Sequence, residues 1–433
     1  MVATRRRTAV SGKPQLWNQQ DLERRLCHAL DIATKTVESL GEGGYSDPQD
    51  AQNQIRPEKV ISETALLLLS ASAVSSLPPV GKRFERAIRA LRPHARSERI
   101  LLGLCLEPAL ALDFATAHVC LSQMGYGDAR FDRLLRQALL CQSRYGRERV
   151  PHRVLEQEWL RGMWTGRPEG KRRWAAARES VLGRPMDLLT GSRDDGYAFT
   201  HALMYVTRLG RSSAKLPRSR KTILLEADAL LARCLDEQDY DLAGEVLLAW
   251  PHTRAAWSAT AAFAFHVLAH VEDRVGFLPN PSTRLDRLKE LTGRARTDYL
   301  LATSYHTIYV MGLLAAAILG AGAMPPVRLP TNGGARGSAD RLLRFLSDVE
   351  PRPHWRERFD SLSSEEERDS LAGLLLAVAL RRKGRQRDFD GMYRLLREGF
   401  DLGLADSPMA SHAAEMLARI AAVGAETRVA RCA

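Results

Sequence analysis

Apolar residues recur along this chain at the three- and four-residue spacing that is typical of amphipathic helices. Alternating runs typical of strands are nearly absent, and the short connections contain Gly or Pro. The longest predicted loop covers residues 321–337. The pattern predicts helices at about 21–40, 57–69, 84–90, 109–118, 131–145, 152–163, 195–208, 221–236, 239–249, 257–272, 283–293, 299–320, 338–347, 364–382, 387–399 and 407–422.

This succession of helices predicts an all-α fold built from antiparallel helical hairpins. Segments 257–271 and 299–320 are apolar on most faces, so we expect them to be buried on all sides. A closed double layer of helices, an α/α toroid, needs such inner helices, whereas an open α-solenoid needs fewer. We therefore favour the toroid-like barrel over the solenoid. No strict 34-residue period supports a regular tetratricopeptide array.

The order of these segments divides the 433 residues into four parts. We predict a flexible basic tail at 1–20, an N-terminal helical region at 21–100, a central helical domain with the candidate site at 101–325, and a C-terminal helical region at 326–433. The chain is 45% hydrophobic and 26% charged, as expected of a soluble globular protein.

Features that would direct the chain to a membrane or out of the cell are weak. The longest apolar run, Val310–Met324, is shorter than a spanning helix of about 18 residues and predicts a core helix. No apolar segment follows Arg5–Arg7, so we expect no secretory signal. The six cysteines include no CxxC pair and look like small core residues in a reducing compartment. These features predict a cytoplasmic protein without a membrane partner.

The net charge of +12 is compatible with an acidic partner or with nucleic acid. The basic residues are spread over several short clusters, and none is interleaved with the aromatic residues of a single-strand groove. We therefore expect a small-molecule or peptide substrate, not nucleic acid. The oligomeric state is left open.

The most unusual polar pattern lies near the middle of the chain. Asp194 and Asp195 suit a helix start, where a carboxylate interacts favourably with the helix dipole. Tyr197, His201 and Tyr205 follow at four-residue spacing and therefore share one face. Burying such groups is costly unless they are paired, so the stripe is either a site or a satisfied core network. We predict Asp194, Asp195, Tyr197 and Tyr205 as catalytic residues.

Two further helix starts carry imidazoles. His152 and Glu156 are four residues apart and could supply two metal ligands, a base with its partner, or a simple surface pair. His306 and Tyr309 share a face where a polar start becomes strongly apolar, and Gly312 would allow close helix packing. We predict Tyr309 as a further catalytic residue. The predicted ligands of a transition metal (iron, zinc or manganese) are His152, Glu156, His201 and His306.

The same groups could run metal-free acid–base chemistry, with a tyrosine as proton carrier. His266 and His270 are also four residues apart, but the pair lacks the glutamate of HExxH, and we interpret it as structural. Glu226 and Asp228 point to different faces of one apolar helix. No phosphate-binding loop, dinucleotide fingerprint, nucleophile elbow or zincin motif occurs in the sequence.

Three stretches of the chain resemble an uncharacterised actinobacterial family, a domain of unknown function often found among specialised-metabolite genes. They are residues 147–160, 193–210 and 305–315. The resemblance spans about 100–320 and implies the same site residues that the patterns indicate. One departure is Arg208, where the family pattern has Asp, which puts any role of that carboxylate in doubt here.

Together these features predict a tailoring enzyme of bacterial natural-product biosynthesis, with a His, carboxylate and Tyr pocket at inner helix ends. The alternative is a helical-repeat scaffold that binds a peptide or carrier protein. A nucleic-acid-binding regulator would need the basic clusters to merge into one face. If His201 and His306 enter one enclosed polar cavity, the enzyme is favoured; if they lie far apart on a groove, the scaffold is favoured.

Overall fold

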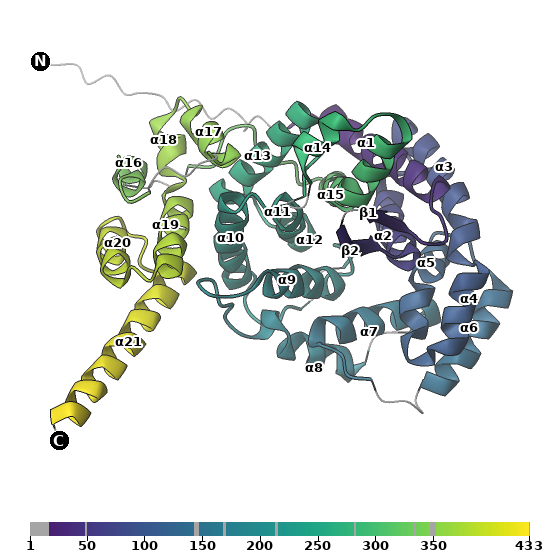
Figure 1. Cartoon of the computed structure of the whole chain (residues 1–433), viewed down its shortest axis with the longest axis horizontal. Helices are drawn as coiled ribbons and strands as arrows, with labels where there is room; N and C mark the ends of the chain where they lie inside the picture. Colours follow the sequence, from purple (N-terminus) through teal and green to yellow (C-terminus); the bar gives the residue numbers. More distant parts are fainter. Residues whose placement is uncertain are drawn as a thin grey trace, which may run out of the picture.

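The computed structural model describes residues 17–47, 50–142, 147–167, 170–212, 215–280, 283–331, 335–346 and 352–432. Most of the predicted basic tail, including Arg5–Arg7, lies outside these residues, as do 332–334 of the predicted long loop. Within the described residues the protein is all-α apart from one two-stranded hairpin, so the predicted fold class is confirmed (Figure 1).

The first part of the chain holds the hairpin and eight longer helices among the described residues. The hairpin pairs β1 and β2 in antiparallel fashion and was not predicted, because its sequence lacks apolar alternation. The bounds are α1 Gln19–Glu38, β1 Tyr45–Asp47, β2 Asp50–Ile55, α2 Pro57–Ala71, α3 Pro78–Ala95, α4 Glu98–Leu106, α5 Ala111–Gln123, α6 Ala129–Gln142, α7 Pro151–Thr165 and α8 Lys171–Glu179.

In the second part of the chain, the elements α9–α21 of the described residues are all helices, joined by loops. The bounds are α9 Arg193–Val206, α10 Arg220–Asp236, α11 Tyr240–Leu247, α12 Ala249–Thr253, α13 Ala259–Val275, α14 Leu285–Glu290, α15 Gly293–Ala321, α16 Ser338–Leu343, α17 His354–Asp360, α18 Glu365–Asp369, α19 Ala372–Gln386, α20 Phe389–Asp401 and α21 Pro408–Cys432.

Local signals in the sequence set several helix starts. Pro57 and Pro151 occupy the first turns of α2 and α7, where a missing N–H costs nothing. The Asp128 carboxylate accepts the Phe131 N–H at 2.9 Å and caps α6. Several predicted boundaries were wrong, and two examples show how. Helix α3 starts at Pro78 and continues through Pro93, and the helix predicted at 364–382 divides into α18 and α19.

Six helices, α2, α5, α7, α9, α11 and α15, form what we call the inner ring, since each contacts the next and α15 contacts α2 again. Helices α1, α3, α4, α6, α8, α10 and α13 lie outside them (Figure 1). This circuit of contacts favours the toroid over the open solenoid, and the choice between these two architectures stays a prediction.

The start of the described chain lies beside the end of the ring. Helix α1 packs along α15, and the Trp17 N–H donates to the Pro325 carbonyl at 3.0 Å. Arg25, buried in α1, is paired with Glu272 and Asp273 at the end of α13. These contacts join segments that are far apart in the sequence, since Arg25 and Asp273 are separated by 248 positions.

Helix α15 is the one described helix that is by itself long and apolar enough to cross a membrane. Helices α4 and α5 meet the same criterion only as a pair bent by 115°. In α15, 67% of the most apolar window is buried inside the protein, where it contacts α1, α2 and α11. A core helix of a soluble protein meets this criterion equally well.

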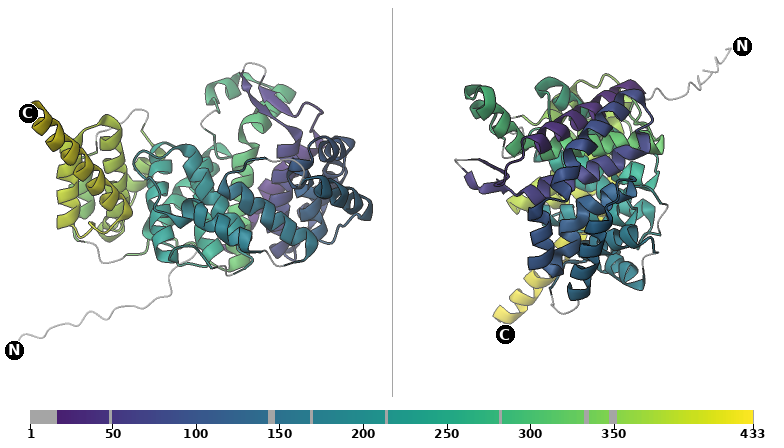
Figure 2. Two further views of the ribbon diagram at one scale, coloured as in Figure 1. Left: turned by 90° about the horizontal axis from the view of Figure 1, so that it is seen from below. Right: turned by 90° about the vertical axis from the view of Figure 1, so that its right-hand side faces the viewer.

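Helices α16–α21 lie to one side of the ring (Figures 1 and 2). Helices α19 and α21 contact α10, and α17 contacts both α10 and α13. Both α10 and α13 are outer helices, so this C-terminal group packs outside the inner ring.

Candidate functional site

The inner ring surrounds a cavity of about 900 Å³. Its lining comes from every helix of the ring, together with residues near the hairpin and before α7. Seven carboxylates and five Lys or Arg side chains line it, although the whole chain carries a net charge of +12. The cavity is therefore more acidic than the protein around it, which favours cationic or neutral polar ligands over anions.

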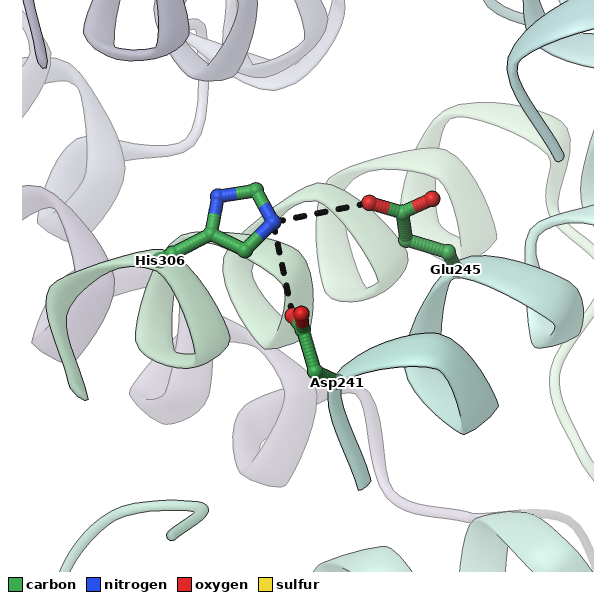
Figure 3. A group of neighbouring side chains, drawn as sticks. All are labelled: Asp241, Glu245 and His306. Atoms are coloured by element: carbon green, nitrogen blue, oxygen red, sulfur yellow. Dashed lines mark ion pairs between the residues drawn. The ribbon is translucent and has the colours of Figure 1, made fainter. Parts of the chain in front are cut away.

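His306 lies at the centre of a group of carboxylates on the cavity wall (Figure 3). Its Nε2 is 3.4 Å from Asp241 Oδ1 and 3.5 Å from Glu245 Oε1. Its Nδ1 is 3.0 Å from Glu63 Oε2. Helix α15 supplies the imidazole, α11 supplies Asp241 and Glu245, and α2 supplies Glu63. Three helices of the ring thus place three carboxylates around one imidazole.

Glu245 links this group to His201 on α9. His201 Nε2 lies 3.6 Å from Glu245 Oε2, and the Thr200 hydroxyl donates to the same oxygen at 2.6 Å. Both imidazoles line the cavity. The two histidines predicted from separate segments are therefore brought together, with one buried carboxylate between them.

The charges of the group depend on one another. Burial disfavours a charged imidazole, but Asp241 and Glu63 together raise the pKa of His306 well above its usual value. Burial also disfavours the ionised carboxylates, yet His306 lowers the pKa of Glu63, and His201 with His306 lowers that of Glu245. Burial dominates at Asp241 and raises its pKa. At neutral pH the group thus holds a charged imidazole between ionised glutamates.

The predicted tyrosines act as hydrogen-bond donors to these carboxylates. Tyr197 donates to Asp241 Oδ2 at 2.6 Å, and Tyr205 donates to Glu156 Oε1 at 2.7 Å. Burial, followed by the facing carboxylate, raises the pKa of both phenols. Tyr309 pairs with the Thr64 hydroxyl at 2.9 Å, and burial raises its pKa too. These phenols keep their protons at neutral pH and hold their partners in place.

Glu156 has no free oxygen. Tyr205 donates to Oε1, and Arg153 donates to Oε2 at 2.7 Å. His152 lies beside His201, with ring centroids 5.8 Å apart, and burial lowers the pKa of His152 to about 4. Of the four predicted metal ligands, His152 and Glu156 therefore sit at the edge of the group, next to His201.

Asp194 and Asp195 do not line the cavity. Asp194 is exposed. Asp195 completes a capping box with Ser192, whose side chain accepts the Asp195 N–H, so Ser192 is the N-cap. The capping box accounts for the position of Asp195, and Asp194 lies in the same first turn of α9.

The sequence interpretation missed Glu63, Asp241 and Glu245. Asp241 and Glu245 are four residues apart in an otherwise apolar helix, the same spacing that drew attention to His152 and Glu156. That signal was available. No histidine or carboxylate four residues from Glu63 marks it in the sequence. Its contacts are with Tyr305 and His306, and Tyr305 lies 242 positions farther along the chain.

Among the described residues, Asp241, Glu245 and His306 form the group that could hold a metal ion, with one potential ligand atom each and all three atoms within 4.8 Å of one another. Only His306 belongs to the predicted ligand set. The predicted set as a whole is not such a group within the described chain.

Comparison with known protein families matches residues 17–316 to a domain of unknown function, DUF6895. The match starts well before residue 100, where the sequence resemblance was expected to begin. It contains the inner ring up to most of α15 and ends before α16–α21. No curated protein and no solved structure matches the chain. Because the match covers well over half of its length, the chain belongs to this family, the domain of unknown function DUF6895.

Proposed function

We propose that the protein is an enzyme that binds a small polar molecule in the central cavity and transfers protons at His201 and His306. One observation carries this proposal: Glu245 lies between the two imidazoles, at 3.6 Å from His201 Nε2 and 3.5 Å from His306 Nε2. Imidazoles held by carboxylates are the usual agents of general acid–base catalysis.

His201 is the group best placed to exchange a proton with a bound molecule. It lines the cavity, 22% of its side chain is exposed, and its Nδ1 has no hydrogen-bond partner in the described structure. Because Nδ1 is buried, the ring would have to turn for this atom to meet a bound molecule. Glu245 would orient the ring through Nε2, and Thr200 would fix Glu245. His306, held by carboxylates at both nitrogens, would stabilise negative charge that develops on the substrate.

The shape of the cavity supports a small ligand. A volume of about 900 Å³ lies within the range of small-molecule sites, and Leu66, Leu248 and Leu313 add apolar surface to the charged lining. The closed circuit of helices supports a toroid-like barrel with this cavity at its centre. The excess of lining carboxylates supports a cationic or neutral substrate, such as an amine.

We extend the proposal to the biological setting that the sequence resemblance implies, which is tailoring of a natural product in the cytoplasm of an actinobacterium. The scaffold alternative is less well supported, since the two imidazoles share one cavity and one carboxylate.

The test is to incubate the purified full chain with a metabolite extract and to follow masses that appear or disappear. We expect the wild type and His270→Ala to convert the same metabolite, because His270 is an exposed histidine outside the cavity. His201→Ala should lose the conversion while keeping its thermal stability. Conversion by His201→Ala at the wild-type rate would contradict the proposal. So would a wild type that converts nothing but captures a carrier protein that His201→Ala also captures.

A further inference from the structure

We propose that Asp241, Glu245 and His306 bind one divalent first-row transition-metal ion. This inference deepens the proposed function and rests on it for the role of the ion, since the ion would lie in the same cavity. The binding site itself is argued from geometry alone.

The spacing of the three ligand atoms fits an ion. Two ligands about 2.1 Å from a tetrahedral metal are about 3.4 Å apart. His306 Nε2 is 3.4 Å from Asp241 Oδ1 and 3.5 Å from Glu245 Oε1 (Figure 3). All three atoms lie within 4.8 Å of one another, so small rotations of the carboxylates bring them around one ion.

The atoms that face this point are the ones that nothing else uses. Asp241 Oδ2 accepts from Tyr197 at 2.6 Å and Glu245 Oε2 accepts from Thr200 at 2.6 Å, which leaves Oδ1 and Oε1 turned toward His306. The side chain of Asp241 is only 4% exposed, yet its Oδ1 has no hydrogen-bond partner in the described structure. A buried carboxylate oxygen without a donor is rare unless a water or an ion satisfies it.

The surroundings resemble the outer shell of known metal sites. A histidine that binds a metal through one nitrogen commonly has a carboxylate behind the other. Glu63 Oε2 lies 3.0 Å from His306 Nδ1 and is itself fixed by the Tyr305 hydroxyl at 2.6 Å. Each of the three ligands is thus oriented by a side chain from a neighbouring part of the ring.

The donor set indicates the class of metal. Two carboxylates balance the charge of a divalent ion. An imidazole favours zinc or iron over magnesium and calcium, and the carboxylates also suit manganese. On binding, the ion would replace the Nε2 proton of His306 between the two carboxylates, because a histidine ligates a metal only as the neutral imidazole. Three protein ligands leave a coordination position open, as in catalytic zinc sites. Glu245 and His306 line the cavity, so that position would face a bound substrate.

This site differs from the predicted set of His152, Glu156, His201 and His306. Both oxygens of Glu156 are already paired, with Tyr205 and Arg153. Glu156 is therefore a matched control for Glu245, because both glutamates line the cavity, both are 8% exposed, and each accepts from a hydroxyl.

The experiment is calorimetric titration of the full chain, stripped with a chelator, with Zn²⁺ and separately with Mn²⁺, Mg²⁺ and Ca²⁺. We expect one Zn²⁺ or Mn²⁺ per chain and no binding of Mg²⁺ or Ca²⁺. Asp241→Asn should weaken the binding by at least about tenfold, and Glu156→Gln should leave it unchanged. Circular dichroism checks that each stripped variant is folded, and Glu245→Gln replaces Asp241→Asn if the latter does not fold.

The proposal is overturned if the wild type binds no transition metal, if Asp241→Asn and Glu245→Gln bind as tightly as the wild type, or if Glu156→Gln loses the ion. The titration contains no substrate, so it is independent of turnover. A chain that binds the ion as expected but converts no metabolite contradicts only the proposed function. A chain that converts a metabolite but binds no ion contradicts only the ion site.

Discussion

At the scale of single residues, three carboxylates at the cavity share one feature, a tyrosine hydroxyl that donates to them from another helix. Tyr197 serves Asp241, Tyr205 serves Glu156 and Tyr305 serves Glu63. A hydrogen bond to a charged acceptor offsets part of the cost of burying it. What distinguishes the carboxylates around His306 is the imidazole beside them, not the hydroxyl.

Asp228 shows how burial changes the pKa of a carboxylate that has no imidazole as its partner among the described residues. The Ser258 hydroxyl donates to Asp228 Oδ1 at 2.6 Å, and burial raises the pKa of Asp228 to about 7. The folded chain therefore binds one proton more than the unfolded chain between the ordinary pKa of an aspartate and about 7. The contribution of Asp228 to the free energy of unfolding is therefore greatest at low pH, and it is lost as the pH rises through that window.

We therefore expect Asp228→Asn to be more stable than the wild type at about pH 8, by about 1–3 kcal/mol of unfolding free energy, and to melt at a higher temperature. Near about pH 4 the two proteins should have the same stability. Asn keeps the acceptor for Ser258 and carries no charge. Thermal melts of both proteins across this range measure the difference. A difference that does not change with pH would show that Asp228 is ionised in the folded protein.

The sequence was most informative where unusual side chains share one helix face. His201 and His306 were found in this way, and both line the cavity. Glu63, Asp241 and Glu245 were missed because each looks like an ordinary acidic residue until its helix is placed beside α15 or α9. Asp194 and Asp195 lie outside the cavity lining, and a local capping box accounts for the position of Asp195.

At the scale of elements, helix existence and type followed from periodicity and from the residues at helix starts. The hairpin β1–β2 and the short helices α4, α8, α12 and α17 were missed, since each is too short to show a clear apolar period. The predicted role of Gly312 in close packing agrees with the structure. A Cβ there would lie 2.4 Å from the Cβ of Ala29 on α1 and 3.0 Å from Leu67 Cδ1 on α2.

Gly312→Val should therefore destabilise the protein by about 1–3 kcal/mol, because the added side chain overlaps α1 at a buried contact. Gly320→Ala in the same helix is the control, since its Cβ would meet Ala73 Cβ at an ordinary 3.6 Å. We expect this change to be neutral or slightly stabilising. Urea unfolding of both variants measures the effect, and equal stability would mean that α1 and α15 are farther apart in solution.

At the scale of the whole molecule, a buried ion pair joins the first helix to a late one. Arg25 on α1 is 1% exposed and contacts Glu272 and Asp273 on α13. Neighbouring Arg24 contacts Asp21 and Asp273 from the surface, with 57% of its side chain exposed. Arg25 also contacts Asp21, so the two arginines share Asp21 and Asp273 as partners. They differ in burial and in the contact of Arg25 with the buried Glu272.

We expect Arg25→Met to cost about 3–5 kcal/mol, because Glu272 is left buried beside fewer positive groups. Arg24→Met should cost less than about 1 kcal/mol, as exposed ion pairs usually do. Chemical denaturation compares the two. Similar losses for both variants would contradict the buried position of Arg25 and its contact between α1 and α13.

The hydrogen bond from Trp17 to Pro325 has a consequence for chain connectivity. The segments before α1 and after α15 are neighbours, so the cavity depends on which helices of the inner ring touch. A circularly permuted form of residues 17–325, with these two ends joined by a short linker and new termini opened in an exposed turn, preserves the contacts of the inner ring but omits α16–α21. The order of the helices around the cavity, more than their order along the chain, is what the cavity requires.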